Sequence, residues 1–196
     1  MKPIRNKHGE FIFKNHPDFL PNLSPQEMFE LGSFGGTYWR PIKSKITGES
    51  YKDVYLQYPD SWWKNIDVKK QLTLPWSQYD KSSNKYGVKV GQTLESWEEK
   101  EWITTCHPYG WVHWYCDFFL GKRHDEEDLR QIKRWKGVSS KQGRFRKWLV
   151  TLIIKKNAAY DDVKISPKIR QTLQHWGYHL TLRDYKQEVE SRNIKK

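Results

Sequence analysis

Residues 125–156 read DEEDLRQIKRWKGVSSKQGRFRKWLVTLIIKK, and they decide how the second half of the chain folds. Four acidic residues come first and basic residues follow, an order that suits a helix because the positive end of the helix dipole attracts carboxylates. We predict a helix over 125–136 that ends before Gly137, and a longer helix over 141–156 that ends near Asn157.

Further helices are expected on both sides of this pair. A helix over 108–120 precedes it, and a helix over 182–189 closes the chain. Between them, Ser166 and Pro167 open another helix that stops before Gly177. In the helices over 125–136, 141–156 and 167–176, apolar residues recur at helical spacing, so each should bury one face and keep cations outside. The expected buried positions are Leu129 and Ile132 in the first, Phe145, Trp148, Leu149 and Leu152 in the second, and Ile169, Leu173 and Trp176 in the third.

The first hundred residues show mixed signals. Ser24 and Glu27 form the pattern of a capping box, so a short helix begins there. Aromatic and β-branched residues over 50–58, and alternation over 86–91, predict two strands. A further helix is expected over 93–102, with a threonine as its cap.

These signals predict an α+β protein with one domain over residues 1–196. Residues 1–104 would form a mixed part with a small antiparallel sheet, and residues 105–196 a predominantly helical, basic part. The chain is rich in tryptophan, with 11 Trp, 11 Tyr and 8 Phe. Because each buried ring removes a large area from water, these side chains can hold a core although the overall composition is polar.

Positive charge is strongly segregated along the chain. Residues 1–128 carry 17 Lys and Arg against 18 Asp and Glu, a net charge of −1, whereas residues 129–196 carry 18 against 5, a net charge of +13. A basic field of this kind attracts polyanions through long-range steering and counterion release. A merely solubilising surface is the alternative interpretation.

No run of 18 apolar residues exists, and the N-terminus lacks the apolar stretch of a signal peptide. Two cysteines give no disulfide framework. We therefore expect an intracellular protein of the nucleus or cytoplasm that does not bind membranes. The sequence leaves the oligomeric state open.

Nucleic acid is the expected partner, and DNA the expected polymer, with Lys and Arg on phosphates. Three amphipathic helices could also form a helix-turn-helix, although the 157–165 connection is longer than that motif's turn. Gln171 and Gln174 could read adenine edges, and Trp135 could stack on a base, but a core position for Trp135 is favoured. The predicted contact residues are Arg130, Lys133, Arg134, Lys141, Arg144, Lys147, Lys168 and Arg170.

The segment from Cys106 to Asp117 holds the candidates for chemistry. His113 and Asp117 lie four residues apart, so on a helix they could be a general base and its orienting carboxylate. Cys106, His107, His113 and Cys116 could instead ligate zinc, but they lack a CxxC pair. The favoured alternative is a buried aromatic helix with a satisfied core histidine, and we predict no metal and no cofactor.

A glycine turn offers one more candidate. Gly35 and Gly36, followed by Arg40, could hold an anion in a nest of backbone N–H groups. The pattern matches neither the P-loop nor the dinucleotide-binding motif, and a simple tight turn is the favoured interpretation.

Several blocks of the sequence, GSFGGTYWRPI, YGWVHWYCDFFLGKR and DLRQIKRW among them, resemble a conserved family of uncharacterised hypothetical proteins. The resemblance covers most of residues 16–178. It implies one cooperative fold and carries over no activity and no catalytic residues.

Three functional hypotheses follow. The first is a nucleic-acid-binding protein that uses the basic C-terminal helices. The second is a nucleic-acid-modifying enzyme with an aromatic pocket around Trp111, His113, Trp114 and Asp117. The third is a structural or assembly protein whose basic face meets an acidic partner protein.

Overall fold

The computed structural model describes residues 3–192. Helix accounts for 46% of these described residues and strand for 5%, in two small antiparallel sheets, so the α+β class with a helical C-terminal half is confirmed. The α-helices are α1 (Pro25–Glu30), α2 (Val68–Gln71), α3 (Leu94–Glu99), α4 (Trp111–Phe119), α5 (Asp125–Ser139), α6 (Arg144–Lys155), α7 (Pro167–His175) and α8 (Leu182–Ser191). The strands are β1 (Ile4–Arg5), β2 (Phe11–Ile12), β3 (Ile42–Lys43) and β4 (Ser50–Tyr51). Short 3-10 turns cover Phe34–Gly36, Val54–Gln57, Asp60–Trp62, Trp76–Gln78 and Lys81–Ser83.

The capping box at the start of α1 is confirmed. The Ser24 hydroxyl accepts the N–H of Glu27 at 3.2 Å, and the Glu27 carboxylate accepts the N–H of Ser24 at 2.7 Å. Two of the donors that a helix start leaves free are therefore satisfied locally.

The two predicted strands are mostly wrong. Within 50–58 only Ser50–Tyr51 pairs, with Ile42–Lys43, and the chain then passes through a left-handed Asp53 into a 3-10 turn. The 86–91 segment forms no strand because its backbone bonds elsewhere: the N–H of Tyr86 donates to the side chain of Gln171.

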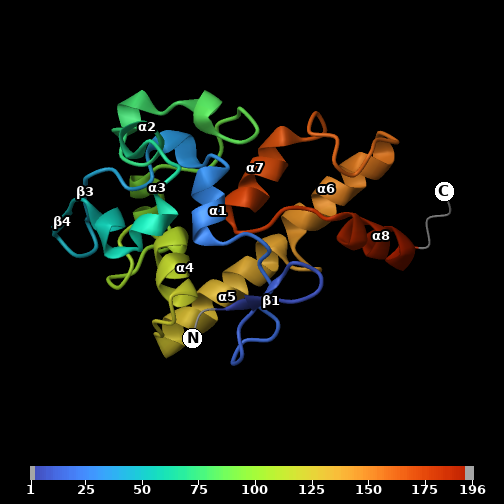
Figure 1. Ribbon diagram of the computed structural model, residues 1–196, viewed down its shortest axis with the longest axis horizontal. Coiled ribbons are helices and arrows are strands. Elements are labelled where there is room, and N and C mark those ends of the chain that lie inside the picture. The colour runs from blue at the N-terminus through green and yellow to red at the C-terminus, as the bar shows by residue number, and fades with distance from the viewer. Residues whose placement is uncertain (1–2, 193–196) are drawn as a thin grey trace.

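Two apolar clusters form the core, and Trp176 packs against both. The larger cluster is aromatic and surrounds α4, where Trp114 and Tyr115 are almost completely buried. The smaller cluster joins α6, α7 and α8. The N-terminal α1 lies beside α7 (Figure 1), and the side chain of Gln174 donates to the carbonyl of Met28 at 2.7 Å. Segments far apart in the sequence therefore share one interior.

The buried face of α6 differs from the prediction. Trp148 is 53% exposed, whereas Arg146 is buried together with Leu149 and Ile153. Arg146 lies inward because it forms an ion pair with Asp184 of α8 at 3.2 Å. In α5, likewise, Leu129 is 64% exposed although it was expected inside.

Membrane-crossing helices are not found: within residues 3–192, no helix combines the necessary length with sufficient apolar character.

Candidate functional site

A cavity of about 330 Å³ lies between the first half of the chain and the basic helices. Its walls are mainly aromatic, and they come from segments spread over 140 residues of sequence. Its aromatic lining residues are Phe34, Tyr38, Trp97, Trp102, Tyr109, Trp111, Phe145 and Trp176.

Local structure explains why α4 faces the cavity with its first turn. Gly110 precedes the helix with φ of +81°, a backbone conformation that other residues rarely adopt. A Cβ at this position would also lie 2.9 Å from the side chain of Ile103. This turn delivers Trp111 and Val112 to the cavity wall.

The basic helices close the other side of the cavity. Arg134 and Val138 line it from α5 and are one turn apart, so they share a face of the helix. Arg144 and Phe145 line it from the start of α6, and Thr172 from α7. The cavity wall thus contains two arginines and no carboxylate.

Arg134 is held between two tryptophans. Its guanidinium lies 5.3 Å from the ring centre of Trp102 and 5.4 Å from that of Trp176. It donates to the carbonyl of Trp102 at 3.3 Å and to the side chain of Gln131 at 2.9 Å. Burial lowers the pKa of Arg134 to about 10, with Arg130 adding to the effect, so the group keeps its charge at neutral pH.

Two further polar side chains line the cavity without carrying charge. Burial lowers the pKa of His175 to about 3, so its imidazole is neutral; its Nε2 accepts the N–H of Phe34 at 3.1 Å. The buried indole N–H of Trp111 has no hydrogen-bond partner among residues 3–192. All the charge of the lining therefore lies on Arg134 and Arg144.

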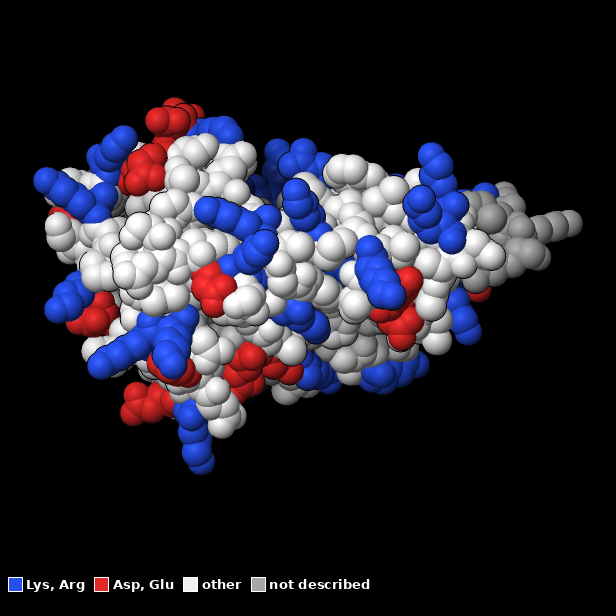
Figure 2. Space-filling view, turned by 90° about the horizontal axis from the view of Figure 1, so that it is seen from above, with Lys and Arg blue, Asp and Glu red and all other residues white. Residues whose placement is uncertain are grey.

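The residues predicted to contact nucleic acid fall into two groups. One group is exposed and forms no ion pair with any residue that the structure describes. Figure 2 shows Lys and Arg distributed over one whole face of the molecule, not gathered in a single patch. The exposed, unpaired members are Lys133, Lys141, Arg144, Lys147 and Lys168.

The other group is engaged within the protein. Arg130 forms an ion pair with Glu127 at 2.7 Å, and Arg170 is buried and donates to the carbonyls of Tyr160 and Ile165. Arg134 belongs to the cavity wall. Arg170 therefore lies inside, not outside as its position in the pattern had indicated.

Gln171, Gln174 and Trp135 are interior residues. Both glutamines are completely buried and bond to α1 and the turn after it, so neither presents its amide to a base. Trp135 is buried as favoured, and its indole N–H donates to the carbonyl of Trp176 at 2.8 Å.

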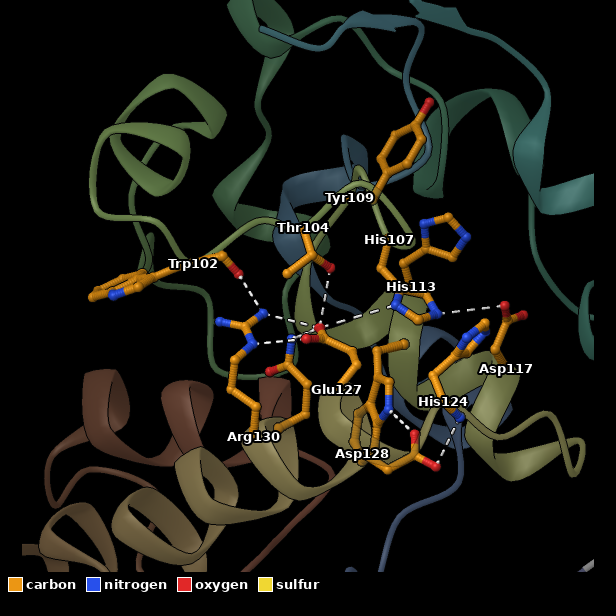
Figure 3. A network of polar contacts seen from close by, with 12 residues as sticks. Trp102, Thr104, His107, Tyr109, His113, Asp117, His124, Glu127, Asp128 and Arg130 are labelled. Atoms are coloured by element: carbon orange, nitrogen blue, oxygen red, sulfur yellow. Dashed lines mark hydrogen bonds and ion pairs between the residues drawn. The ribbon is translucent and has the colours of Figure 1, made fainter. Parts of the chain in front are cut away.

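His113 and Asp117 lie outside the cavity, in a buried polar cluster (Figure 3). Asp117 contacts His107 at 3.6 Å, Lys122 at 3.0 Å and the hydroxyl of Tyr58 at 3.1 Å. Burial opposes ionisation, but the close approach of His107 and the hydrogen bond from Lys122 lower the pKa of Asp117 to about 2. Burial and the neighbouring His107 lower the pKa of His113 to about 3.

His107 connects this cluster to α5. Its Nδ1 lies 4.0 Å from the Glu127 carboxylate, which also accepts from Arg130, Gln131 and Thr104 (Figure 3). His107 is fully buried. The cluster therefore supports the interior, and no carboxylate or histidine of the proposed acid–base pair reaches the cavity.

The alternative of a zinc site is not supported: within residues 3–192, no three His, Cys, Asp or Glu side chains are placed to hold a metal ion. Cys106 is exposed and Cys116 is buried. Burial, above all, raises the pKa of the Cys116 thiol well above its usual value, so it packs as a neutral side chain.

The glycine turn uses its N–H groups internally. The N–H of Gly35 donates to the side chain of Asn84 at 2.8 Å, and that of Gly36 to the carbonyl of Ser33 at 3.2 Å. Arg40 donates to the carbonyl of Thr37 and lies over the ring of Trp76. The close packing of this turn matches the favoured interpretation as a tight turn.

Sequence reasoning missed most of the cavity. It grouped Trp111 with Trp114, yet Trp114 lies in the core and donates to Asp128. In the cavity wall, Trp111 instead packs against Trp176, which comes from a distant segment. The one available signal was the abundance of tryptophan, which does not show which rings converge.

No family model, curated protein or solved structure matches the chain.

Proposed function

We propose that the chain binds nucleic acid, with DNA as the expected polymer, through the cations of α5, α6 and α7. The observation that carries the proposal is the aromatic cavity between these helices and the first half of the chain, with Arg134 and Arg144 in its wall and no carboxylate. Aromatic faces beside arginines suit a ligand that combines flat bases with phosphates.

The exposed cations support binding along a polymer. Arg144 lies at the cavity, and Lys168 is one turn from Thr172, which lines it, so both are on the cavity side of their helices. Because these side chains form no ion pair within residues 3–192, a phosphate does not have to displace an internal carboxylate.

Two arguments favour nucleic-acid binding over a nucleic-acid-modifying enzyme and over binding of an acidic partner protein. The acid–base candidates His113 and Asp117 are buried away from the cavity, which removes the support for a reaction there. An acidic partner protein would satisfy the cations but would leave the aromatic cavity without a matching ligand group.

The decisive experiment measures binding to a labelled DNA strand over a range of salt concentrations. Binding to five phosphates would give a slope of log K against log[salt] of about −3.5 for a single strand. Replacing Arg144 and Lys168 by Gln should weaken binding and make the slope shallower by about 0.7 for each lost contact. Replacing the exposed Lys43 and Lys64, which lie in the first half of the chain, provides the matched control.

Affinity that does not change with salt would refute the proposal. Equal effects of the two double variants would refute the assignment to α6 and α7. If a polyglutamate chain competes as well as unlabelled DNA, an acidic protein is the better partner; an RNA strand in parallel tests the choice of DNA.

A further inference from the structure

The aromatic cavity is too specific in its chemistry to be explained by attraction to phosphates alone. Phosphate contacts need exposed cations, and α5, α6 and α7 carry these at Lys133, Lys147 and Lys168. The cavity instead places tryptophan, tyrosine and phenylalanine rings from both halves of the chain around one space. Those rings require a second kind of ligand group.

The size and lining of the cavity indicate a single small planar group. At about 330 Å³ the cavity lies at the lower end of the usual range for small-molecule pockets. Aromatic rings favour stacking of a base and tolerate any sequence. In the wall, Trp102 lies beside Arg134 and Phe145 lies beside Arg144, so a stacking ring and a cation are adjacent at both positions.

The charge of the cavity indicates that the group is attached to an anion. Arg134 is fixed by Trp102 and Gln131, so its position in the wall is set before any ligand arrives. It has no carboxylate within ion-pair distance among residues 3–192; Glu127 lies about two turns away on α5 and pairs with Arg130 instead. Arg144, at the beginning of α6, adds a second cation that is exposed.

We infer that the cavity holds one unpaired base, with the adjoining phosphate on Arg134 and Arg144. This inference rests on the proposed function and narrows it: the preferred polymer is single-stranded, or carries a base that is out of the stack. Bases inside a duplex are paired and stacked, so they cannot enter such a cavity without being extruded.

The test uses 2′-deoxyadenosine 5′-monophosphate, measured by calorimetry with the whole chain, and the nucleoside without phosphate beside it. The nucleotide should bind, and the nucleoside should bind more weakly because it lacks the charge that Arg134 and Arg144 meet. A single strand should bind more tightly than the duplex that it forms with its complement.

Two pairs of variants locate the binding. Trp102→Leu removes a ring of the cavity, and Trp148→Leu removes an exposed ring that does not line it. We expect Trp102→Leu to weaken nucleotide binding about 5- to 150-fold, the range for one lost base-stacking ring, and Trp148→Leu to leave it unchanged. Arg134→Lys should weaken binding because it removes the planar fork, whereas Lys64→Gln, at an exposed position in the first half of the chain, should not.

Thermal unfolding of each variant separates lost binding from lost structure, and Phe145→Leu provides a second cavity variant if Trp102→Leu does not fold. Salt-dependent binding of the strand without any nucleotide binding would overturn the inference and leave the proposed function standing. Equal affinities of the Trp102 and Trp148 variants for the nucleotide would also overturn it. If neither strand nor nucleotide binds, both the inference and the proposed function fail.

Discussion

Lys122, just beyond the end of α4, forms an ion pair of 3.0 Å with Asp117 in the last turn of that helix, and the two side chains differ greatly in burial. Asp117 is 10% exposed, whereas Lys122 is 51% exposed. The Asp117 carboxylate therefore lies in the protein interior, whereas the Lys122 ammonium group that pairs with it lies at the surface. His107 meets the same carboxylate from inside at 3.6 Å.

This arrangement predicts a loss of stability in acid. The pKa of Asp117 is lowered to about 2 from its ordinary value of 3.8, so its contribution to stability is fully present above about pH 4 and is lost as pH falls toward 2. The contribution is on the order of 2 kcal/mol. Asp117→Asn should flatten the decline of the unfolding free energy between pH 4 and pH 2, measured by denaturant titration. Asp60→Asn, at an exposed site, is the control; identical pH profiles for the two variants would contradict the assignment.

The buried, neutral imidazole of His175 predicts a second pH dependence of the unfolding free energy, which begins at a higher pH than that of Asp117. Its Nε2 accepts the N–H of Phe34 and lies 3.0 Å from the side-chain amide nitrogen of Gln171. Protonation would place a hydrogen where the imidazole now accepts one. The pKa of about 3 in the folded protein lies below the ordinary histidine pKa of 6.5, so this contribution to stability is complete above about pH 6.5 and declines as pH falls toward 3.

The slope of that decline can be assigned by substitution. His175→Gln keeps an acceptor but cannot titrate, so it should reduce the slope by up to about 1.4 kcal/mol per pH unit. His113, with a folded pKa of about 3 for the same reason, should contribute a similar slope that remains in this variant. A slope that His175→Gln leaves unchanged would show that the imidazole is already charged in the fold.

Local signals in the sequence predicted most of the helices, but α2 was not predicted, and α5 continues through Gly137, where a stop was predicted. The start of α1 follows from Ser24 and Glu27 because a capping box satisfies its donors with residues three positions apart. The acidic first turn of α5 is another local signal. In both cases the interaction that determines the structure lies within one or two turns of chain.

Contacts between distant residues could not be predicted in the same way. Trp148 was expected on the buried face of α6, but Arg146 is buried there instead, in an ion pair with Asp184. Because Asp184 lies 38 positions away in the sequence, no local pattern indicates this pairing. The cavity poses the same problem, since Phe34 and Trp176 meet in its wall from opposite ends of the chain. Composition showed that rings were available, and only the fold shows which of them converge.

The ion pair between Arg146 and Asp184 should be essential to the C-terminal helices. Their side chains are 8% and 5% exposed, and the carboxylate of Asp184 also accepts the hydroxyl of Tyr178 at 2.8 Å. Arg146→Met leaves that carboxylate buried without its cation and should cost about 3–5 kcal/mol of unfolding free energy, measured with urea.

A double-mutant cycle checks the origin of that loss. Arg146→Met combined with Asp184→Asn should recover part of the stability, because the unpaired charge is removed. Additive losses from the two single variants would mean that the ion pair itself contributes little. Lys147→Met, at the exposed neighbouring position, should change stability by less than about 0.5 kcal/mol.

The close approach of Gly36 to Lys70 predicts that the turn after α1 does not tolerate a side chain at this position. Its φ is +75°, and a Cβ would lie 2.2 Å from the carbonyl oxygen of Lys70. Gly48 has the same φ of +75° but no atom within 4 Å of the added Cβ. Gly48→Ala should therefore cost only the left-handed backbone conformation, about 1–2 kcal/mol, whereas Gly36→Ala should cost clearly more because the 70–74 backbone must also move. Equal losses in thermal or urea unfolding would show that conformation alone demands the glycine and that the approach of Lys70 is easily relieved.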